Sequence, residues 1–499
     1  MNFTNPNNLK GCQDCPRRAG ETGSVAGCCA NASTIFENAY YDYKRLSLET
    51  FDVDVTKFAG LGPSAGIASS EETWQRALKV IPAGTQTLSK GPSCFVEGVS
   101  PKYLLRGKGS RVWDVDGNEY IDYGLGCLPI TLGYNFPEID KAIQDQLADG
   151  ITFTMMHPLE VEVSERLVDM IPGAEMVRFG KNGSDVTAMS IRLARHITGR
   201  DRVACLGYHG FQDWYIATTD RSFGIPETVK ELTSTFTYND IDSLKALFDA
   251  NPGEFACVIM EPAIFEFPEP GFLESVRELT HQHGALLVFD EMITGMRFAV
   301  GGGQEFFGVV PDLACFGKGI ANGMPLGVLA GLEKHMRNFE EVFFSSTYGG
   351  EALTLAAAKA GLDFYANNPV LPRLWRAGKT LFDNFNASIK ARNMEENASV
   401  SGFPVRFMVS FVDANGEGDH RLNALFQQEM TKRGIVGWAI FGLSYSHSDE
   451  ELLYTTHAFA ETLDVIKEAI ASDDLSAYME GTPPEPVFKA LREKKQTAN

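Results

Sequence analysis

Short apolar runs without polar alternation recur between about residue 175 and residue 335, and stretches with helical periodicity separate them. A strand that is apolar throughout is buried on both faces, which is typical of parallel sheets covered by helices. The pattern therefore predicts an α/β fold with a mostly parallel central sheet. The expected strands are 176–179, 203–206, 256–260, 285–289 and 313–316.

The flanking regions predict a second, smaller α/β domain formed by N- and C-terminal segments. Residues 111–122 indicate a hairpin that turns at Asp116-Gly117, and residues 137–147 have the pattern of an amphipathic helix. A long helix is expected after Gly349. The expected organisation is 1–70 flexible N-terminal extension, 71–150 N-terminal segment of the small domain, 151–365 large domain, 366–471 C-terminal small domain and 472–499 tail.

Composition narrows the classes of function. The 499 residues carry a net charge of 44 − 65 = −21, which disfavours nucleic acid and anionic membranes as partners. No apolar run approaches the roughly 20 residues that span a bilayer, and the polar N-terminus lacks the pattern of a signal peptide. Nine cysteines in such a long chain favour a reducing compartment, so we expect a cytoplasmic protein.

Four of the cysteines lie close together near the N-terminus. Cys12 and Cys15 form a C-x2-C pair, whereas Cys28 and Cys29 are adjacent. A metal or iron–sulfur site needs converging thiolates, and the second pair lacks the spacer that lets both sulfurs converge. This pattern favours a flexible extension with incidental thiols, and no metal is expected.

Ligands of open α/β sheets gather at the carboxyl ends of the strands, so the residues that follow the expected strands are candidates for function. Lys318 stands between two glycines after the run 313–316. It is either a turn lysine that points to water or a nucleophilic amine. Asp290 and Glu291 follow the run 285–289, where a buried acid needs a cationic partner. That partner is either a side chain such as Arg297 or Lys318, or the protonated ring nitrogen of a cofactor.

Further candidates follow the other strands. Gly183 and Ser184 fall where a helix should start, so they either cap that helix or bind a phosphate with free backbone N–H groups. Tyr208 can offer a flat face and His209 can orient a planar ligand, although both are also consistent with core packing. Glu261 is a third acid at the end of a strand.

The combination suits pyridoxal phosphate, which has a phosphate, a flat ring, a basic ring nitrogen and an aldehyde. From about Thr73 to Ala471 the chain resembles the class III aminotransferases of the fold-type I pyridoxal-phosphate enzymes, and especially the glutamate-1-semialdehyde aminomutase-like branch. The supporting segments are VFDEMITGMR (288–297), FGKGIANGMPLGVLAG (316–331), STYGGEALTLAAAKAG (346–361), NGSDVTAMSIRLARHITGR (182–200), GYHG (207–210) and VWDVDGNEYIDYGLG (112–126).

The resemblance implies a role for each candidate. Lys318 corresponds to the lysine that forms a Schiff base with the cofactor, and Asp290 to the acid that keeps the ring nitrogen protonated. Gly183 and Ser184 correspond to phosphate-binding residues, and Tyr208 to the residue that stacks on the ring.

The same resemblance adds cofactor-site residues and a partner. His209 and Glu261 are counted among the residues near the cofactor. Thr347 corresponds to a threonine that reaches the phosphate from the other subunit, which implies a homodimer with shared active sites.

Two positions differ from the aminomutase pattern. Lys90 falls where aminomutases have an arginine that grips the substrate carboxylate, and Ala439 falls where they have a glutamate. Lysine is a point charge rather than a bidentate fork, so Lys90 is a weaker substrate-binding candidate. We therefore favour an intermolecular aminotransferase acting on small-molecule amines and carbonyl compounds. The alternatives are a mutase, racemase or ammonia-lyase on the same cofactor and, last, a non-catalytic protein of this fold.

Overall fold

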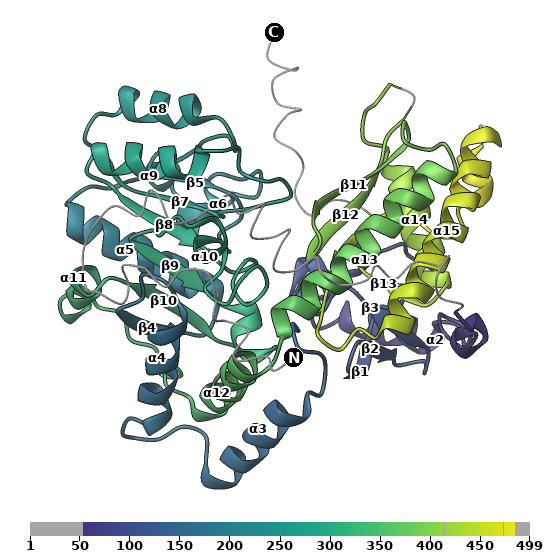
Figure 1. Ribbon diagram of the computed structural model, residues 1–499, viewed down its shortest axis with the longest axis horizontal. Coiled ribbons are helices and arrows are strands. Elements are labelled where there is room, and N and C mark those ends of the chain that lie inside the picture. Colours follow the sequence, from purple (N-terminus) through teal and green to yellow (C-terminus); the bar gives the residue numbers. More distant parts are fainter. Residues whose placement is uncertain (1–52, 414, 473, 485–499) are drawn as a thin grey trace, which may run out of the picture. The chain divides into compact units, whose positions relative to one another are not determined.

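The structure is a computed structural model that describes residues 53–413, 415–472 and 474–484. The chain divides into two compact units (Figure 1). Within the described residues, unit 1 comprises 137–373, and unit 2 comprises 53–136 with 374–484. The sequence predictions for Cys12, Cys15, Cys28 and Cys29 lie outside the described residues.

Unit 1 is built on a seven-stranded sheet in the order β4-β10-β9-β8-β7-β5-β6. All five strands expected from the sequence are present, and β10 is the strand that runs antiparallel to its neighbours. The prediction of a mostly parallel sheet is therefore confirmed. The strands are β4 (Met176–Gly180), β5 (Arg202–Leu206), β6 (Thr233–Thr235), β7 (Phe255–Met260), β8 (Leu286–Asp290), β9 (Leu313–Phe316) and β10 (Gly327–Gly331).

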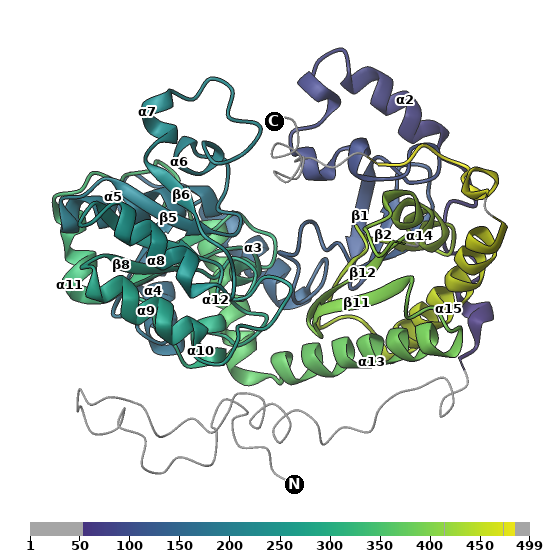
Figure 2. The same ribbon diagram turned by 90° about the horizontal axis from the view of Figure 1, so that it is seen from above.

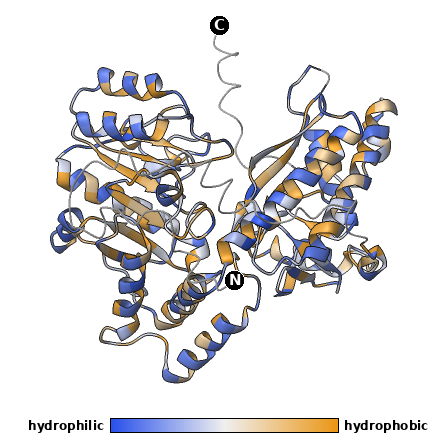
Figure 3. Cartoon of the chain, viewed as in Figure 1, coloured by the Kyte–Doolittle hydropathy of each residue, from blue (hydrophilic) through white to orange (hydrophobic). Residues whose placement is uncertain are grey.

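Helices cover both faces of this sheet. The longer ones are α3 (Pro137–Asp149), α4 (Pro158–Met170), α5 (Gly183–Thr198), α8 (Ile241–Ala250), α9 (Phe272–Gln282) and α12 (Ala352–Asn367). The shorter ones are α6 (Asp213–Ile216), α7 (Glu227–Lys230), α10 (Gly303–Phe307) and α11 (Glu333–Met336). Helices α5 and α6 pack on one face of the sheet, and α8 and α9 pack on the other. The apolar strands lie between helices whose outer sides are hydrophilic (Figure 3).

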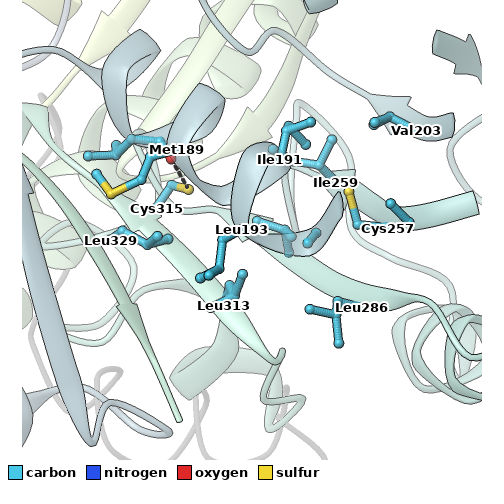
Figure 4. Packing of buried hydrophobic residues seen from close by; sticks show 14 of the residues in the cluster. Met189, Ile191, Leu193, Val203, Cys257, Ile259, Leu286, Leu313, Cys315 and Leu329 are labelled. Carbon is cyan, nitrogen blue, oxygen red and sulfur yellow. Dashed lines mark hydrogen bonds between the residues drawn. The ribbon is translucent and has the colours of Figure 1, made fainter. Parts of the chain in front are cut away.

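Side-chain alternation along the strands decides which groups face α5. Leu286 and Val288 of β8 pack with Leu193 of α5, whereas Leu287 and Phe289 pack with α8 and α9. Figure 4 shows the α5 side of this core, where the Cys315 thiol lies 3.6 Å from the carbonyl oxygen of residue 186. Because side chains alternate with a period of two, the last residue of β8 also points to the α5 face.

Unit 2 contains a four-stranded sheet in the order β1-β2-β3-β13 and a three-stranded sheet in the order β11-β12-β14. Helix α13 lies beside the second sheet and α15 (Figure 2). The ring of Phe385 on this helix meets Phe407 of β12 and stacks on Phe459 of α15 at 3.8 Å. The strands are β1 (Leu104–Lys108), β2 (Arg111–Asp114), β3 (Glu119–Asp122), β11 (Ala398–Phe403), β12 (Arg406–Phe411), β13 (Ile435–Val436) and β14 (Ile440–Gly442). The helices are α2 (Ala68–Ala77), α13 (Val370–Ala391), α14 (His420–Lys432) and α15 (Asp449–Ser472).

Local structure in and around unit 2 agrees with the sequence in one place and departs from it in another. The expected hairpin is present as the antiparallel pair β2–β3, which turns at Asp116-Gly117. Residues 53–70, by contrast, were assigned to a flexible extension, yet they contain the short helix η2 (Val55–Phe58) and the start of α2. Phe58 is 3% exposed and stacks on Tyr454 at 4.3 Å, so its apolar burial holds this segment on unit 2.

Helix α3 belongs to unit 1, although the sequence assigned its residues to the small domain, because it packs against α12. Among the described residues, no helix combines the length and the apolar character needed to cross a membrane.

Candidate active site

The candidate residues of unit 1 gather at the carboxyl edge of the large sheet. Asp290 is the last residue of β8 and is paired in register with Cys315 of β9. Lys318 follows Cys315 by three residues. On the other side of β8, β7 ends at Met260 and is followed at once by Glu261. Because β5, β7, β8 and β9 run parallel, their following segments meet at this edge.

Asp290 is fixed by two hydrogen bonds. Its Oδ2 lies 2.9 Å from Nδ1 of His209, and its Oδ1 accepts the backbone N–H of Met292 at 3.1 Å. The side chains of Asp290 and His209 are 1% and 0% exposed, so a sequence candidate and its neighbour form a buried acid–imidazole pair. The sequence did not indicate this pairing, since 81 residues separate the two positions.

The start of α5 adjoins the segment after β5. Ser184 Oγ accepts the backbone N–H of Phe211 at 3.1 Å. Gly210 has φ +104°, and a Cβ there would lie 2.1 Å from Ser184 Oγ, so only glycine allows this approach. The N–H groups of Gly183 and Ser184 belong to the first turn of a 16-residue helix, where no intrahelical acceptor exists. This geometry suits an anion.

Met292 is a member of this region that sequence reasoning missed. Its Sδ lies 2.9 Å from where a Cβ on Gly183 would stand, and 2.6 Å from the equivalent point on Gly317. The thioether therefore fills the space between the start of α5 and the turn that carries Lys318. Nothing in the apolar periodicity marks Met292, because this contact depends on how three separate segments converge.

Lys318 opens the short helix η6 (Lys318–Ala321) with φ +42°, in the left-handed region. A non-glycine residue with this backbone conformation is strained and is found mainly where the surrounding structure requires it. Gly317 has an extended backbone, and its missing side chain leaves room for Met292. The glycine before the lysine thus meets a packing requirement, which a simple surface turn does not explain.

The side chain of Glu261 binds the backbone of Tyr208. Glu261 Oε1 accepts the N–H of Tyr208 at 2.9 Å, and Glu261 is 9% exposed. The Tyr208 ring is 54% exposed within the described chain, and its edge-to-face contact is with Tyr215 at 5.4 Å. Glu261 therefore orients the segment from which the Tyr208 ring projects.

Two candidates are not drawn into this group. Thr347 is exposed in the segment before α12, and no hydrogen bond joins it to the residues above within the described part of unit 1. Lys90 ends the short helix η4 (Leu88–Lys90) of unit 2 and is also exposed.

Glu291 turns away from this cluster and into a buried loop. Its Oε2 accepts the Thr294 hydroxyl and the N–H of Gly303 at 2.6 Å, and its Oε1 accepts the N–H of Gln304 at 2.8 Å. Burial raises the pKa of Glu291 to about 7, although these three donors act in the opposite direction. The side chain thus ties the end of β8 to the start of α10.

We expect Glu291 to make folding pH-dependent. The folded pKa of about 7 exceeds the reference value of 4.5, so the folded chain keeps a proton that the unfolded chain releases between these values. The contribution of Glu291 is fully present below about pH 4.5 and is lost as the pH rises through about 7, by about 3 kcal/mol in total. Glu291→Gln should lower stability at pH 5 but flatten this slope. Denaturant unfolding at several pH values measures the free energy of unfolding and hence this slope.

The exposed loop acid Glu266 provides the control, because Glu266→Gln should leave the wild-type slope in place. A Glu291→Gln protein whose stability still falls by the same amount over this pH interval would contradict the assignment.

Comparison with known proteins agrees with this architecture. The family model for class III aminotransferases matches residues 97–469, so the chain belongs to that family. It is therefore a pyridoxal-phosphate-dependent enzyme of fold type I.

Individual relatives include both transferases and mutases. The chain is 34% identical to 3-aminobutyryl-CoA aminotransferase of Cloacimonas acidaminovorans (strain Evry), over 81% of this chain and 99% of the relative. It is 32% identical to glutamate-1-semialdehyde 2,1-aminomutase of Syntrophobacter fumaroxidans (strain DSM 10017 / MPOB), over 80% and 98%. Among solved structures, the FumI protein of Sphingopyxis sp. MTA144 superposes with a TM-score of 0.75 and 28% identity, over 81% of this chain and 97% of FumI.

The residues present fit the cofactor. Gly210 packs closely on Ser184 at the start of α5, where an anionic phosphate suits the first-turn N–H groups. The buried Asp290 suits a cationic ring nitrogen, and Lys318 follows the neighbouring strand β9 by two residues. No group of three or more potential metal ligands occurs among the described residues.

Proposed function

We propose that the chain is an intermolecular aminotransferase in which Lys318 attaches pyridoxal phosphate and Asp290 pairs with its ring nitrogen. The observation that carries the proposal is that Asp290 ends β8 and Lys318 follows β9, the strand paired with it, so that both lie at one sheet edge beside α5. A turn lysine or a structural acid would not need this arrangement. The membership of the chain in the class III aminotransferases supports it.

Each residue has a separate task in this proposal. The first-turn N–H groups of Gly183 and Ser184 bind the phosphate, and Tyr208 packs against the ring. Bound pyridoxal phosphate supplies an aldehyde and an electron-accepting ring. Asp290 supplies a negative charge in a dry environment, where it favours a proton on the ring nitrogen.

Lys318 has two tasks. As a free amine, its Nζ would hold the cofactor covalently through the aldehyde carbon. When not bound to the cofactor, Nζ would take the proton from the amine-bearing carbon of the substrate and give it to C4′ of the cofactor. Its place at the end of β9 keeps this amine on the same sheet edge as Asp290.

Intermolecular transfer is favoured over the mutase reaction by two positions in unit 2. Ala439 has no carboxylate where the aminomutases have a glutamate, and it adopts φ +61° in the turn between β13 and β14. Lys90 offers a single charge in place of a bidentate arginine. The aminomutase reaction remains the second candidate because relatives of that kind are 32% identical.

The half-reaction separates the two candidates. The purified holoenzyme is mixed with an amino donor and no acceptor, and its cofactor and products are measured. Conversion of the cofactor to pyridoxamine phosphate, with one keto product per site, is expected for a transferase. Product that accumulates while the cofactor stays unchanged would instead establish the mutase or lyase class.

The donor panel should compare α-amino with β-amino acids. The relative from Cloacimonas acidaminovorans is named for a substrate whose amine lies on the third carbon, so β-amino donors belong in the first screen. A response to neither group would direct the screen to simple amines.

We also propose a homodimer in which Thr347 approaches the active site of the partner subunit. Thr347 lies between the exposed residues Phe343 (79%) and Tyr348 (57%). The N–H of Ala352 donates to the carbonyl of Ile151 at 2.9 Å, which brings this segment beside the connection between α3 and α4. That connection exposes Met155 (78%) and Met156 (86%), and such grouped apolar exposure marks association surfaces. Light scattering in solution measures the molecular mass of the assembly and so tests whether it is a dimer.

We place the protein in the cytoplasm. The five described cysteines are free thiols, which suits a reducing compartment; they are Cys94, Cys127, Cys205, Cys257 and Cys315. Fractionation of the native source tests this.

A further inference from the structure

We infer that Trp214 and Tyr215 of α6 are positioning residues for the proposed cofactor site, because together they hold His209 against Asp290 and support the ring of Tyr208. This inference rests on the proposed function and assigns a task to a short helix that lies outside the family motifs quoted above.

The imidazole of His209 has no freedom left for a ligand. Its Nε2 lies 3.1 Å from the carbonyl oxygen of Leu206, and its Nδ1 faces Asp290. A carbonyl only accepts, so Nε2 must donate to it, and the proton between Nδ1 and Oδ2 joins His209 to Asp290. His209 therefore acts on a cofactor through Asp290 and not by direct contact.

Two aromatic rings fix the plane of this imidazole. Trp214 stacks on it with centroids 5.9 Å apart and planes 17° apart, and Tyr215 meets it at 75° and 5.4 Å. Both residues are nearly buried, at 7% and 9% exposure. A hydrogen bond of 2.8 Å from the Thr233 hydroxyl to the carbonyl of Trp214 anchors α6 to β6. The orientation of Asp290 thus depends on groups two contacts away.

Tyr215 also contacts the residue next to His209. Its ring lies edge-on to Tyr208 at 5.4 Å and 83°, while Tyr208 itself is more than half exposed. One side chain therefore contacts both the charge partner of Asp290 and the proposed stacking ring. A displacement of Tyr215 would disturb the two together.

The indole of Trp214 supports a role beyond filling space. Its Nε1 is buried and makes no hydrogen bond within the described chain. A buried donor without a partner is unfavourable, and a phenylalanine or leucine would avoid it. The indole nevertheless provides a large flat face that stacks on the imidazole of His209.

The test compares side chains that keep or remove these rings in the holoenzyme. Tyr215→Leu removes the edge contacts, Tyr215→Phe keeps the ring, and Trp214→Leu removes the stacking face. Trp375→Phe, at a tryptophan 2% exposed in α13 of unit 2, provides a matched control for the loss of buried aromatic volume. The readouts are the release rate of pyridoxal phosphate, kcat and KM for an amino donor, and the melting temperature of the cofactor-free protein.

Tyr215→Leu and Trp214→Leu should release the cofactor about tenfold faster and lose about tenfold in kcat, with KM little changed, because the groups that act on the cofactor are misplaced. Tyr215→Phe should remain within about threefold of the wild type on both measures. Trp375→Phe should lower the melting temperature without faster release.

Equal release and kcat for Tyr215→Leu and Tyr215→Phe would overturn the inference, even if Trp214→Leu fails to fold. So would losses that simply follow the melting temperature, as in Trp375→Phe. A wild-type protein that does not bind pyridoxal phosphate would overturn the proposed function itself. Normal binding by the wild type with unaffected variants would overturn the positioning role alone.

Discussion

Lys318→Ala should lower turnover about a million-fold, because it removes both the amine that attaches the cofactor and the group that moves the substrate proton. The proposed phosphate-binding N–H groups of Gly183 and Ser184 and the carboxylate of Asp290 remain, so the variant should still bind pyridoxal phosphate, but reversibly. Borohydride reduction followed by peptide mass spectrometry provides the direct measurement. The wild type should carry the reduced pyridoxyl group on Lys318, and the variant should carry none.

Lys359→Ala is a suitable control for Lys318, since Lys359 pairs with Asp363 and Glu162 on the helical surface of the same unit. It should retain the labelled peptide at Lys318 and normal turnover. A reduced pyridoxyl group found on a different lysine of the wild-type protein would refute the assignment.

The strands of unit 1 could be predicted because a strand buried on both faces is an uninterrupted run of apolar residues. β7 is apolar at every position and buried at every position. Strand β10 could not be recognised as antiparallel from Gly327–Gly331, because strand direction depends on the connection and not on the side chains. The order within residues 53–70 could not be predicted because it depends on contacts with residues far along the chain, such as Tyr454 on Phe58 and Asn118 on Ala65.

The candidate site shows the same division. Asp290, Glu261 and Lys318 follow apolar runs, so their place at one edge could be inferred from the chain. The contacts of His209 and Met292 could not, since each depends on segments that are far apart in sequence. Local patterns therefore locate the groups that do chemistry, whereas the groups that orient them emerge only from packing.

The surroundings of Trp214 illustrate why. In the sequence, an aromatic pair at 214–215 has no distinguishing pattern, and its two neighbours in space, His209 and Tyr208, lie in the preceding loop. A four-residue helix gives too few positions to reveal which face is buried. The buried fraction and the ring angles carry information that the periodicity of such a short element lacks.

Asp290→Asn should reduce kcat by about 10⁴-fold, which is the scale seen when an amide replaces an essential buried carboxylate. The amide carries no charge, so a proton on the ring nitrogen loses its stabilising partner, and its Nδ2 or Oδ1 must also face His209. Because Lys318 is intact, borohydride should still fix the cofactor to it. Stopped-flow measurement of the half-reaction therefore reports the loss as slow proton removal and not as a missing cofactor.

Asp312→Asn is the matched control for Asp290, because Asp312 is also a buried acid that pairs with a histidine in this sheet, His281, at 2.8 Å. It immediately precedes β9 and so lies at the opposite edge from Asp290. Burial opposes its charge, but the hydrogen bond with His281 and the nearby His335 ring lower the pKa of Asp312 below its ordinary range, so the substitution should cost stability and leave the half-reaction intact. If both variants instead lost kcat alike, charge burial in general, and not the position of Asp290, would account for the effect.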